Sequence, residues 1–377
     1  MAAQPSLHLT ALSPPDSRPV SFLWVVLECS IRCKAGRQVS FIGRRLRRLR
    51  GAIRITRGRI IVTNSEVDVV IGTGPLGLSV TRLLLAKGRT VRAINRRGKV
   101  SAPPGVEVLA GDIGEPGFAR GACRSAATIY LCAKPPYQRM AEDFQPIMDG
   151  AIIAAAASQA KLVYADNHYA YGPVSGELRE DMPYGATGPK GRARARLATQ
   201  LMTLHAEGRI RATIGRASDF YGPMVLESAV GERVFAFALA GKAASVTGHP
   251  DTLHTYTFID DFASGLVTLG EREEALGQAW HVPSAETMTT RRFVELVFED
   301  LGRPPRIQSA PRWMLSVLGL FDPVVRQLPE VLYQTERPFV VDHSKFERAF
   351  GARPTPHREA IHKTLAWYRQ HALNATA

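Results

Sequence analysis

The sequence is poor in cysteine and in long apolar runs. Its 377 residues include four cysteines, Cys29, Cys33, Cys123 and Cys132, which are too few for a disulfide framework and show no zinc-ligand spacing. The longest apolar candidate, residues 22–27, falls far short of the roughly 20 residues that a membrane-spanning helix needs. These absences argue against a disulfide-stabilised scaffold, a metal module and a membrane protein. A reducing cytoplasm is the simplest compartment for such a chain.

Acidic residues are scarce in one segment only. The formal net charge is +14, but residues 1–65 hold 12 of the 48 Lys and Arg residues and only 2 of the 34 Asp and Glu residues. Ten of the fourteen excess positive charges therefore lie in this leader, and the rest of the chain is nearly neutral. Nucleic-acid binding is thus not expected unless the leader belongs to the native protein.

The leader itself, residues 1–62, has three interpretations. Its Pro/Ser-rich start and Arg-rich continuation are typical of a disordered nucleic-acid-binding arm or of a targeting segment. The third interpretation is that the leader is not native and that translation begins at Val62, read from a GTG codon. No methionine lies between Met1 and Met140, and the first strand predicted for the folded part of the chain, at residues 67–71, would normally lie within the first few residues of its domain. Mass spectrometry of the native N-terminus tests this start, and peptides from residues 20–55 would refute it.

Beyond the leader, short apolar runs alternate with helical segments. Strands are predicted at residues 67–71, 90–94, 106–110, 128–132, 161–164 and 210–214, and helices at 78–87, 148–160 and 192–207. This alternation indicates a doubly wound, Rossmann-type α/β fold with a parallel sheet covered on both faces. After residue 222 the alternation lapses, and helices at 290–302 and 357–371 predict a small, mostly helical lobe.

The expected organisation has three parts. Residues 1–62 form the basic leader, and residues 63–222 form a Rossmann-type domain. Residues 223–377 form the smaller lobe, from which a strand and helix at about 256–270 return to the Rossmann-type domain.

The first predicted strand runs into three glycines, Gly72, Gly74 and Gly77, with the spacing G-x-G-x-x-G. In a strand–turn–helix context, the first glycine turns the chain, the second lets backbone approach a pyrophosphate, and the third lets the helix pack on the strand. Amide groups at the new helix N-terminus, around Pro75 and Leu76, then face the phosphates. The motif predicts a dinucleotide site.

The second strand ends in Asn95, Arg96 and Arg97, about 18 residues after Gly77, where dinucleotide folds recognise the adenosine ribose. A carboxylate there would favour NAD. An amide and two guanidinium groups suit a 2′-phosphate instead, so NADP is favoured over NAD. The alternative is that the two arginines belong to a solvated turn.

Two further strand ends supply candidate cofactor contacts. Asp112 and Ile113 follow the third strand, where the carboxylate could accept from an adenine amino group. Cys132, Ala133 and Lys134 follow the fourth strand, and the small residues among them would let a nicotinamide ribose lie close.

Four other stretches carry a family resemblance. Residues 162–173 (LVYADNHYAYGP), 216–223 (RASDFYGP), 257–263 (TFIDDFA) and 342–345 (DHSK), together with the helix that bears Trp367, resemble the short-chain dehydrogenase/reductase superfamily. The similarity is to its extended branch, the NAD(P)-dependent epimerase/dehydratase family, and covers about residues 64–371. The resemblance implies an oxidoreductase or epimerase acting on a hydroxyl or carbonyl carbon of a small molecule, either a nucleotide-sugar or another alcohol or ketone. A homodimer is compatible with it.

The candidate catalytic residues depart from the family pattern. Ile71 stands where the branch usually has the first glycine of G-x-x-G-x-x-G. Asn167 stands at the position of the Ser or Thr that hydrogen-bonds the substrate oxygen, although an amide can still donate to a carbonyl. His168, beside it, is a candidate substitute acid or base because imidazole ordinarily titrates near neutral pH.

In the family, a tyrosine exchanges a proton with the substrate, and a lysine one helical turn later lowers its pKa and holds the nicotinamide ribose. Here Tyr184 is followed four residues later by Gly188, and the nearest lysine, Lys190, lies in a Gly/Pro-rich stretch predicted to be a loop. Either Tyr184 and Lys190 converge from that loop, or the site is altered and the protein is a non-catalytic NADP-binding redox sensor. No metal site is predicted.

Overall fold

The computed structural model describes residues 52–56, 59–63, 67–98, 100, 102–310, 320 and 329–374. Most of the predicted leader, with Cys29 and Cys33, lies outside these residues. Its described part consists of strands β1 (Ala52–Thr56) and β2 (Arg59–Thr63), which pair in antiparallel register and were not predicted. Contacts between residues divide the chain into two units at residues 65 and 66.

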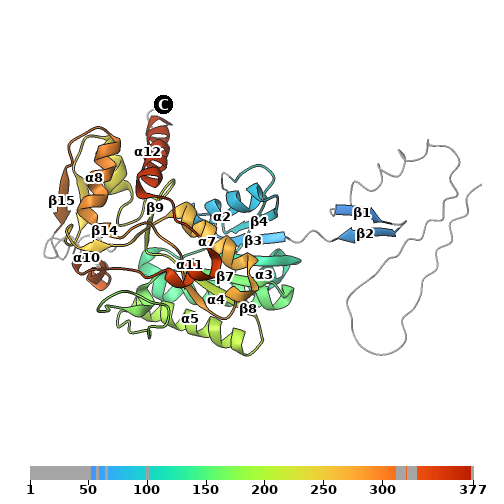
Figure 1. Cartoon of the computed structure of the whole chain (residues 1–377). Coiled ribbons are helices and arrows are strands. Elements are labelled where there is room, and N and C mark those ends of the chain that lie inside the picture. Colours follow the sequence, from blue (N-terminus) through green and yellow to red (C-terminus); the bar gives the residue numbers. More distant parts are fainter. Residues whose placement is uncertain are drawn as a thin grey trace, which may run out of the picture. The chain divides into compact units, whose positions relative to one another are not determined.

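A seven-stranded parallel sheet forms the centre of the second unit (Figure 1). Its order is β13-β8-β7-β6-β3-β4-β5, with all six pairings parallel. The strands are β3 (Val67–Ile71), β4 (Thr90–Asn95), β5 (Glu107–Ala110), β6 (Ala126–Leu131), β7 (Lys161–Asp166), β8 (Arg211–Arg216) and β13 (Ala279–His281). The predicted Rossmann-type fold is confirmed. The sequence did not predict β13, because three residues are too short for a recognisable pattern.

Alternate residues of the strands enter two separate cores, because successive side chains of a strand point to opposite faces. Val70 packs in one core with α2 (Pro75–Ala86) and α7 (Ile259–Glu271). Val69 and Ile71 pack in the other, with α3 (Pro116–Ala122), α4 (Met140–Ser158) and α5 (Pro189–Ala206). Each fully buried aliphatic side chain contributes about 1.5–3 kcal/mol to the stability of the fold. The strand register that buries Val70 on one face and Val69 and Ile71 on the other is therefore strongly favoured.

The lobe is mostly helical, as predicted, and three two-stranded pairings lie outside the seven-stranded sheet. Strand β9 (Asp219–Tyr221) pairs with β12 (Tyr256–Phe258), β10 (Ala244–Thr247) with β15 (Ile307–Ala310), and β11 (Leu253–His254) with β14 (Met288–Thr289). The helices are α6 (Glu232–Leu239), α8 (Thr290–Asp300), α10 (Tyr333–Glu336), α11 (Ser344–Phe350) and α12 (His357–Asn374). Figure 1 shows α8, β14 and β15 gathered away from β3 and β4.

Short 3₁₀ turns complete the connections at Tyr137–Arg139, Tyr169–Tyr171 and Glu273–Ala275. The helix predicted at 290–302 is α8, whose N-cap Thr289 accepts a hydrogen bond from the amide of Arg292 (3.1 Å). The helix predicted at 357–371 is α12. Across the described segments, no helix has the length and apolar character needed to cross a membrane.

Candidate active site

The glycine turn lies between β3 and α2 at the carboxyl edge of the sheet. Gly72 has φ of +99°, and a Cβ there would lie 2.6 Å from the backbone of Ala133. A Cβ on Gly77 would overlap the carbonyl oxygen of Gly72, whereas a Cβ on Gly74 would meet nothing within 4 Å. Sterics therefore demand glycine at the first and third positions. Gly74, the N-cap of α2, presents open backbone at the helix N-terminus, where dinucleotide folds ordinarily bind a pyrophosphate.

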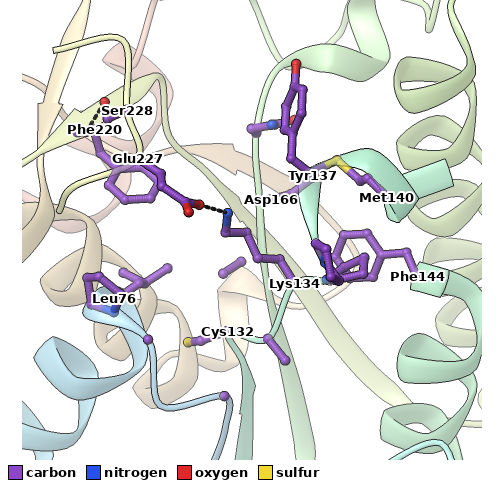
Figure 2. Close-up of a pocket in the computed structure, with 18 of the residues that line it drawn as sticks. Leu76, Cys132, Lys134, Tyr137, Met140, Phe144, Asp166, Phe220, Glu227 and Ser228 are labelled. Carbon is purple, nitrogen blue, oxygen red and sulfur yellow. Dashed lines mark hydrogen bonds and ion pairs between the residues drawn. The ribbon is translucent and has the colours of Figure 1, made fainter. Parts of the chain in front are cut away.

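A cavity of about 1140 Å³ runs from this turn along the ends of β4, β5, β6, β7 and β8 to the lobe (Figure 2). Its size exceeds that of an ordinary drug-sized pocket and leaves room for a dinucleotide and a second ligand. The predicted cofactor residues that line it are Gly72, Gly74, Pro75, Leu76, Asn95, Arg96, Asp112, Ile113, Cys132, Ala133 and Lys134. Gly77 and Arg97 are not among the lining residues.

Asn95 organises the exit of β4. Its Nδ2 donates to Thr73 Oγ1 (2.9 Å), and its Oδ1 accepts from the amides of Arg97 (3.0 Å) and Gly98 (2.5 Å). This side-chain turn ties the exit of β4 to the glycine loop. It leaves Arg96, and not Arg97, on the cavity wall.

Asn167 and His168 follow β7, and both line the cavity. Asn167 Oδ1 accepts from the amide of Tyr169 (3.1 Å), which leaves the Nδ2 donor for another partner. His168 is 2 % exposed, and its ring nitrogens make no hydrogen bond of ordinary geometry with the described residues. Its burial, with His281 and Arg216 nearby, lowers its pKa well below the ordinary value. His168 is therefore neutral at pH 7, which corrects the expectation of a group titrating near neutrality.

The structure does not bring Tyr184 or Lys190 to the cavity wall. Tyr184 is 36 % exposed, and its Oη accepts from Arg216 Nη2 (2.7 Å). Lys190 is 3 % exposed, and its Nζ lies 3.2 Å from Glu330 Oε2. The same Nζ lies 4.6 Å from the ring centroid of Tyr137, a residue that does line the cavity.

The stretch around Lys190 is helical, and its prediction as a loop was wrong. Helix α5 begins at Pro189, because proline is well suited to the first helical position, where no amide hydrogen is needed. Gly188, the N-cap, has no side chain to satisfy the free amides. Glu330 does so instead, because its Oε1 accepts from the amides of Lys190 (2.8 Å) and Gly191 (3.3 Å). A side chain at position 188 would collide with Glu330.

Arg194 is a cavity residue that sequence reasoning missed. It lies one helical turn after Lys190 on α5, and its Nη1 donates to Asp166 Oδ1 (2.8 Å) and Tyr164 Oη (2.9 Å). The spacing of the family's Tyr-x-x-x-Lys pair is thus occupied on α5 by Lys190 and Arg194. Counting four residues forward from Lys190, instead of backward, would have found this position.

Asp166 lies between two buried guanidinium groups. Arg194 approaches one carboxylate oxygen, and Arg216 Nε lies 3.0 Å from the other. Burial lowers the pKa of Arg216, but the Asp166 carboxylate and the nearby Tyr171 and Tyr184 outweigh it and raise that pKa above its ordinary value. Two cations and one anion therefore place a net positive charge beneath the ends of β7 and β8, beside Asn167.

A parallel sheet of this order, with a glycine turn between β3 and α2, defines a Rossmann-type dinucleotide-binding protein. The chain belongs to the NAD dependent epimerase/dehydratase family, whose model matches residues 69–282, more than half of the sequence. The predicted family is therefore confirmed, and so is NAD(P) as its cofactor.

The individual proteins and solved structures that this chain resembles share 14–26 % of its residues. Sterol demethylase protein B of Methylococcus capsulatus is 26 % identical over 327 residues, covering 80 % of this chain and 97 % of that protein. The dTDP-glucose 4,6-dehydratase of Bacillus anthracis, solved with NAD, is 16 % identical with a TM-score of 0.64, over 81 % of this chain and 97 % of that one. The UDP-N-acetylglucosamine 4-epimerase of Methanobrevibacter ruminantium is 14 % identical with a TM-score of 0.68, over 82 % and 100 % of the two chains.

Proposed function

We propose that this protein is an NAD(P)-dependent oxidoreductase or epimerase that acts on a hydroxyl or carbonyl carbon of a small molecule. One observation carries the proposal. A single cavity joins the glycine turn to Asn167 at the end of β7 and continues to Phe339 in the lobe. A cofactor and a substrate bound in this cavity would meet at the end of β7.

Several residues fit the cofactor. The open backbone at Gly74 would hold the pyrophosphate, Asp112 the adenine, and Arg96 a 2′-phosphate, so NADP is preferred. A bound nicotinamide would supply or accept the hydride. Cys132 and Ala133, which line the cavity at the end of β6, are small enough to let a ribose lie against them.

The substrate oxygen would be held at the end of β7. Asn167 Nδ2 can donate to a carbonyl oxygen, because Oδ1 of the same amide is already engaged by the backbone. The excess positive charge of the Arg194–Asp166–Arg216 cluster would stabilise negative charge developing on that oxygen. Arg194 lines the cavity and Lys190 does not, so contact with the nicotinamide half is better assigned to Arg194. Tyr184 as acid or base stays a prediction.

The second candidate, a non-catalytic NADP-binding redox sensor, is favoured by a specific observation. The two residues that resemble the family's proton-transfer pair are each engaged elsewhere, Tyr184 with Arg216 and Lys190 with Glu330. A protein that binds the cofactor without turnover could tolerate this arrangement.

Turnover decides between the two functions. The experiment follows NADPH oxidation by purified protein with a panel of aldehydes and ketones, and chromatographic conversion of nucleotide-sugars by the protein supplied with NADP+ or NAD+. For an oxidoreductase, Asn167→Ala should lower kcat by about 10²–10³-fold, the cost of removing one oxyanion donor, while the Kd for NADPH stays unchanged. Tyr184→Phe should lower kcat if Tyr184 is the acid. Saturable NADPH binding with no turnover of any substrate would contradict the oxidoreductase and support the sensor.

A further inference from the structure

Part of the wall at the lobe end of the cavity is apolar, beside hydroxyl, amide and charged groups. Phe220, Leu226, Leu332 and Phe339 line it, and Leu332 and Phe339 are almost fully buried in the protein. Phe220 also packs against the ring of Phe262, at 6.0 Å between centroids. Figure 2 shows Phe220 on the side of the cavity opposite Tyr137 and Phe144. The apolar part of this wall would bind a ligand by removing apolar surface from water.

The charged groups at the same end are mostly acidic. Among the described residues, three carboxylates line it, those of Asp219, Glu227 and Glu232, against the cations of Lys134 and Arg233. Lys134 reaches across the cavity to Glu227, at 3.6 Å (Figure 2). The other lining cations, Arg96 and Arg194, belong to the cofactor end. These numbers of carboxylates and cations leave out residues 311–319 and 321–328, which the structure does not describe.

This charge pattern opposes a nucleotide-sugar. Its diphosphate carries two negative charges, and proteins hold such groups with Arg, Lys or helix N-termini. With Lys134 and Glu227 paired to each other, the diphosphate would face, among the described residues, the carboxylates of Asp219 and Glu232 against the single cation of Arg233. A neutral ligand meets no such repulsion.

Several buried polar groups that line the cavity lack a hydrogen-bond partner among the described residues, and the Ser218 hydroxyl is one of them. Ser218 lines the cavity directly after β8, and its buried Oγ has no hydrogen-bond partner among the described residues. An unsatisfied buried hydroxyl is costly, and a single oxygen on a ligand would satisfy it. The site thus combines these apolar side chains with Asn167 and Ser218, two polar groups that can bond a ligand oxygen.

We infer that the substrate is a neutral, largely apolar alcohol or ketone and not a nucleotide-sugar. This inference rests on the proposed function, since it names the substrate class of the same site. The predicted ligand has one reacting oxygen directed to Asn167 and an apolar body against Leu226, Leu332 and Phe339.

Binding to the full chain loaded with NADP+, which cannot reduce a ketone, tests the inference. Calorimetric titrations with a saturated steroid ketone and with 2-decalone should saturate, whereas UDP-glucose at tenfold higher concentrations should produce no saturable heat. Leu226→Glu should weaken ketone binding at least ~10-fold by placing a carboxylate against the apolar ligand. The affinity for NADP+ should not change.

The chain offers a matched control. Leu253 is 45 % exposed, close to the 47 % of Leu226, but it is not among the residues lining the cavity. Leu253→Glu should therefore leave ketone binding unchanged. If both variants weaken binding equally, or Leu226→Glu has no effect, the inference is wrong.

The remaining outcomes separate the inference from the proposed function. Saturable binding of UDP-glucose, or no saturable binding of either ketone, overturns the substrate class. Turnover of a nucleotide-sugar would support the oxidoreductase or epimerase while overturning the inference. Ketone binding without turnover of any substrate would support the inference and contradict the proposed catalysis.

Discussion

Acid destabilisation through His281 is the prediction that the structure defines most sharply. His281 ends β13 and is fully buried. Its Nδ1 lies 2.9 Å from the carbonyl oxygen of Asp342 and its Nε2 lies 2.9 Å from Tyr171 Oη. Because a carbonyl only accepts, Nδ1 carries the hydrogen and Nε2 accepts from Tyr171. Protonating Nε2 would break that hydrogen bond and add a cation near Arg216, which itself donates to Tyr171 Oη (2.7 Å).

The magnitude follows from the pKa. Burial, reinforced by Arg216, lowers the pKa of His281 from 6.5 to about 3. Between these values the unfolded chain binds more protons than the folded one, so stability falls as the pH falls from about 6.5 toward 3. From about pH 7.5 to pH 5 this one histidine should cost about 2 kcal/mol of the free energy of unfolding.

Urea denaturation at about pH 7.5 and pH 5 measures this cost. His281→Gln should be less stable than wild type at the higher pH, because a buried hydrogen bond is lost. It should nevertheless lose about 2 kcal/mol less than wild type between the two pH values. Val282→Ala, at the neighbouring buried position, is the control: it should lower stability at both pH values and leave the pH-dependent loss unchanged. Equal acid losses in His281→Gln and wild type would refute the reasoning.

Three further predictions concern the cofactor site and the buried charges. Arg96→Ala should weaken NADPH binding by about 10- to 100-fold in fluorescence titrations, the worth of a charge-assisted contact to phosphate, and leave NADH binding unchanged; equal loss for both cofactors would contradict the NADP assignment. Asp166→Asn should cost about 3–5 kcal/mol in urea denaturation, because two buried guanidinium groups lose their anion, whereas Asp251→Asn at an exposed ion pair should leave the midpoint unchanged. Gly77→Ala should abolish measurable NADPH binding, because its Cβ would overlap the Gly72 carbonyl, while Gly117→Ala, whose Cβ meets nothing within 4 Å in α3, should bind NADPH as wild type does.

Local patterns were sufficient for the sheet. Strands β3, β4, β6 and β7 are short apolar runs bounded by turns, and each lies where its pattern predicted it. The glycine turn was equally readable, because the steric demands at Gly72 and Gly77 arise within the strand–turn–helix unit or at the adjacent strand end. Such features depend on residues close in sequence or on the regular geometry of parallel strands. The periodicity of apolar residues and the spacing of a motif are therefore enough to predict them.

The candidate site was only partly predictable. Asn167 and His168 line the cavity as the motif alignment suggested, but the low pKa of His168 depends on its burial and on His281, which lies far away in the sequence. The role of Asn95 in the turn, which leaves Arg96 on the cavity wall, requires its contact with Thr73. These contacts join separate segments of the chain, so no pattern within a single segment predicts them.

By itself, the sequence determined the Rossmann-type sheet, the glycine turn and the family, because these depend on local sterics and on the period of apolar residues. Only the tertiary structure decided where α5 begins and what faces the cavity. Glu330 supplies the missing cap of α5 from 140 residues away and pairs with Lys190, and Arg216 binds Tyr184 at the edge of the buried charge cluster. Hydrogen bonds and ion pairs between distant segments form only when the folded chain brings them within reach.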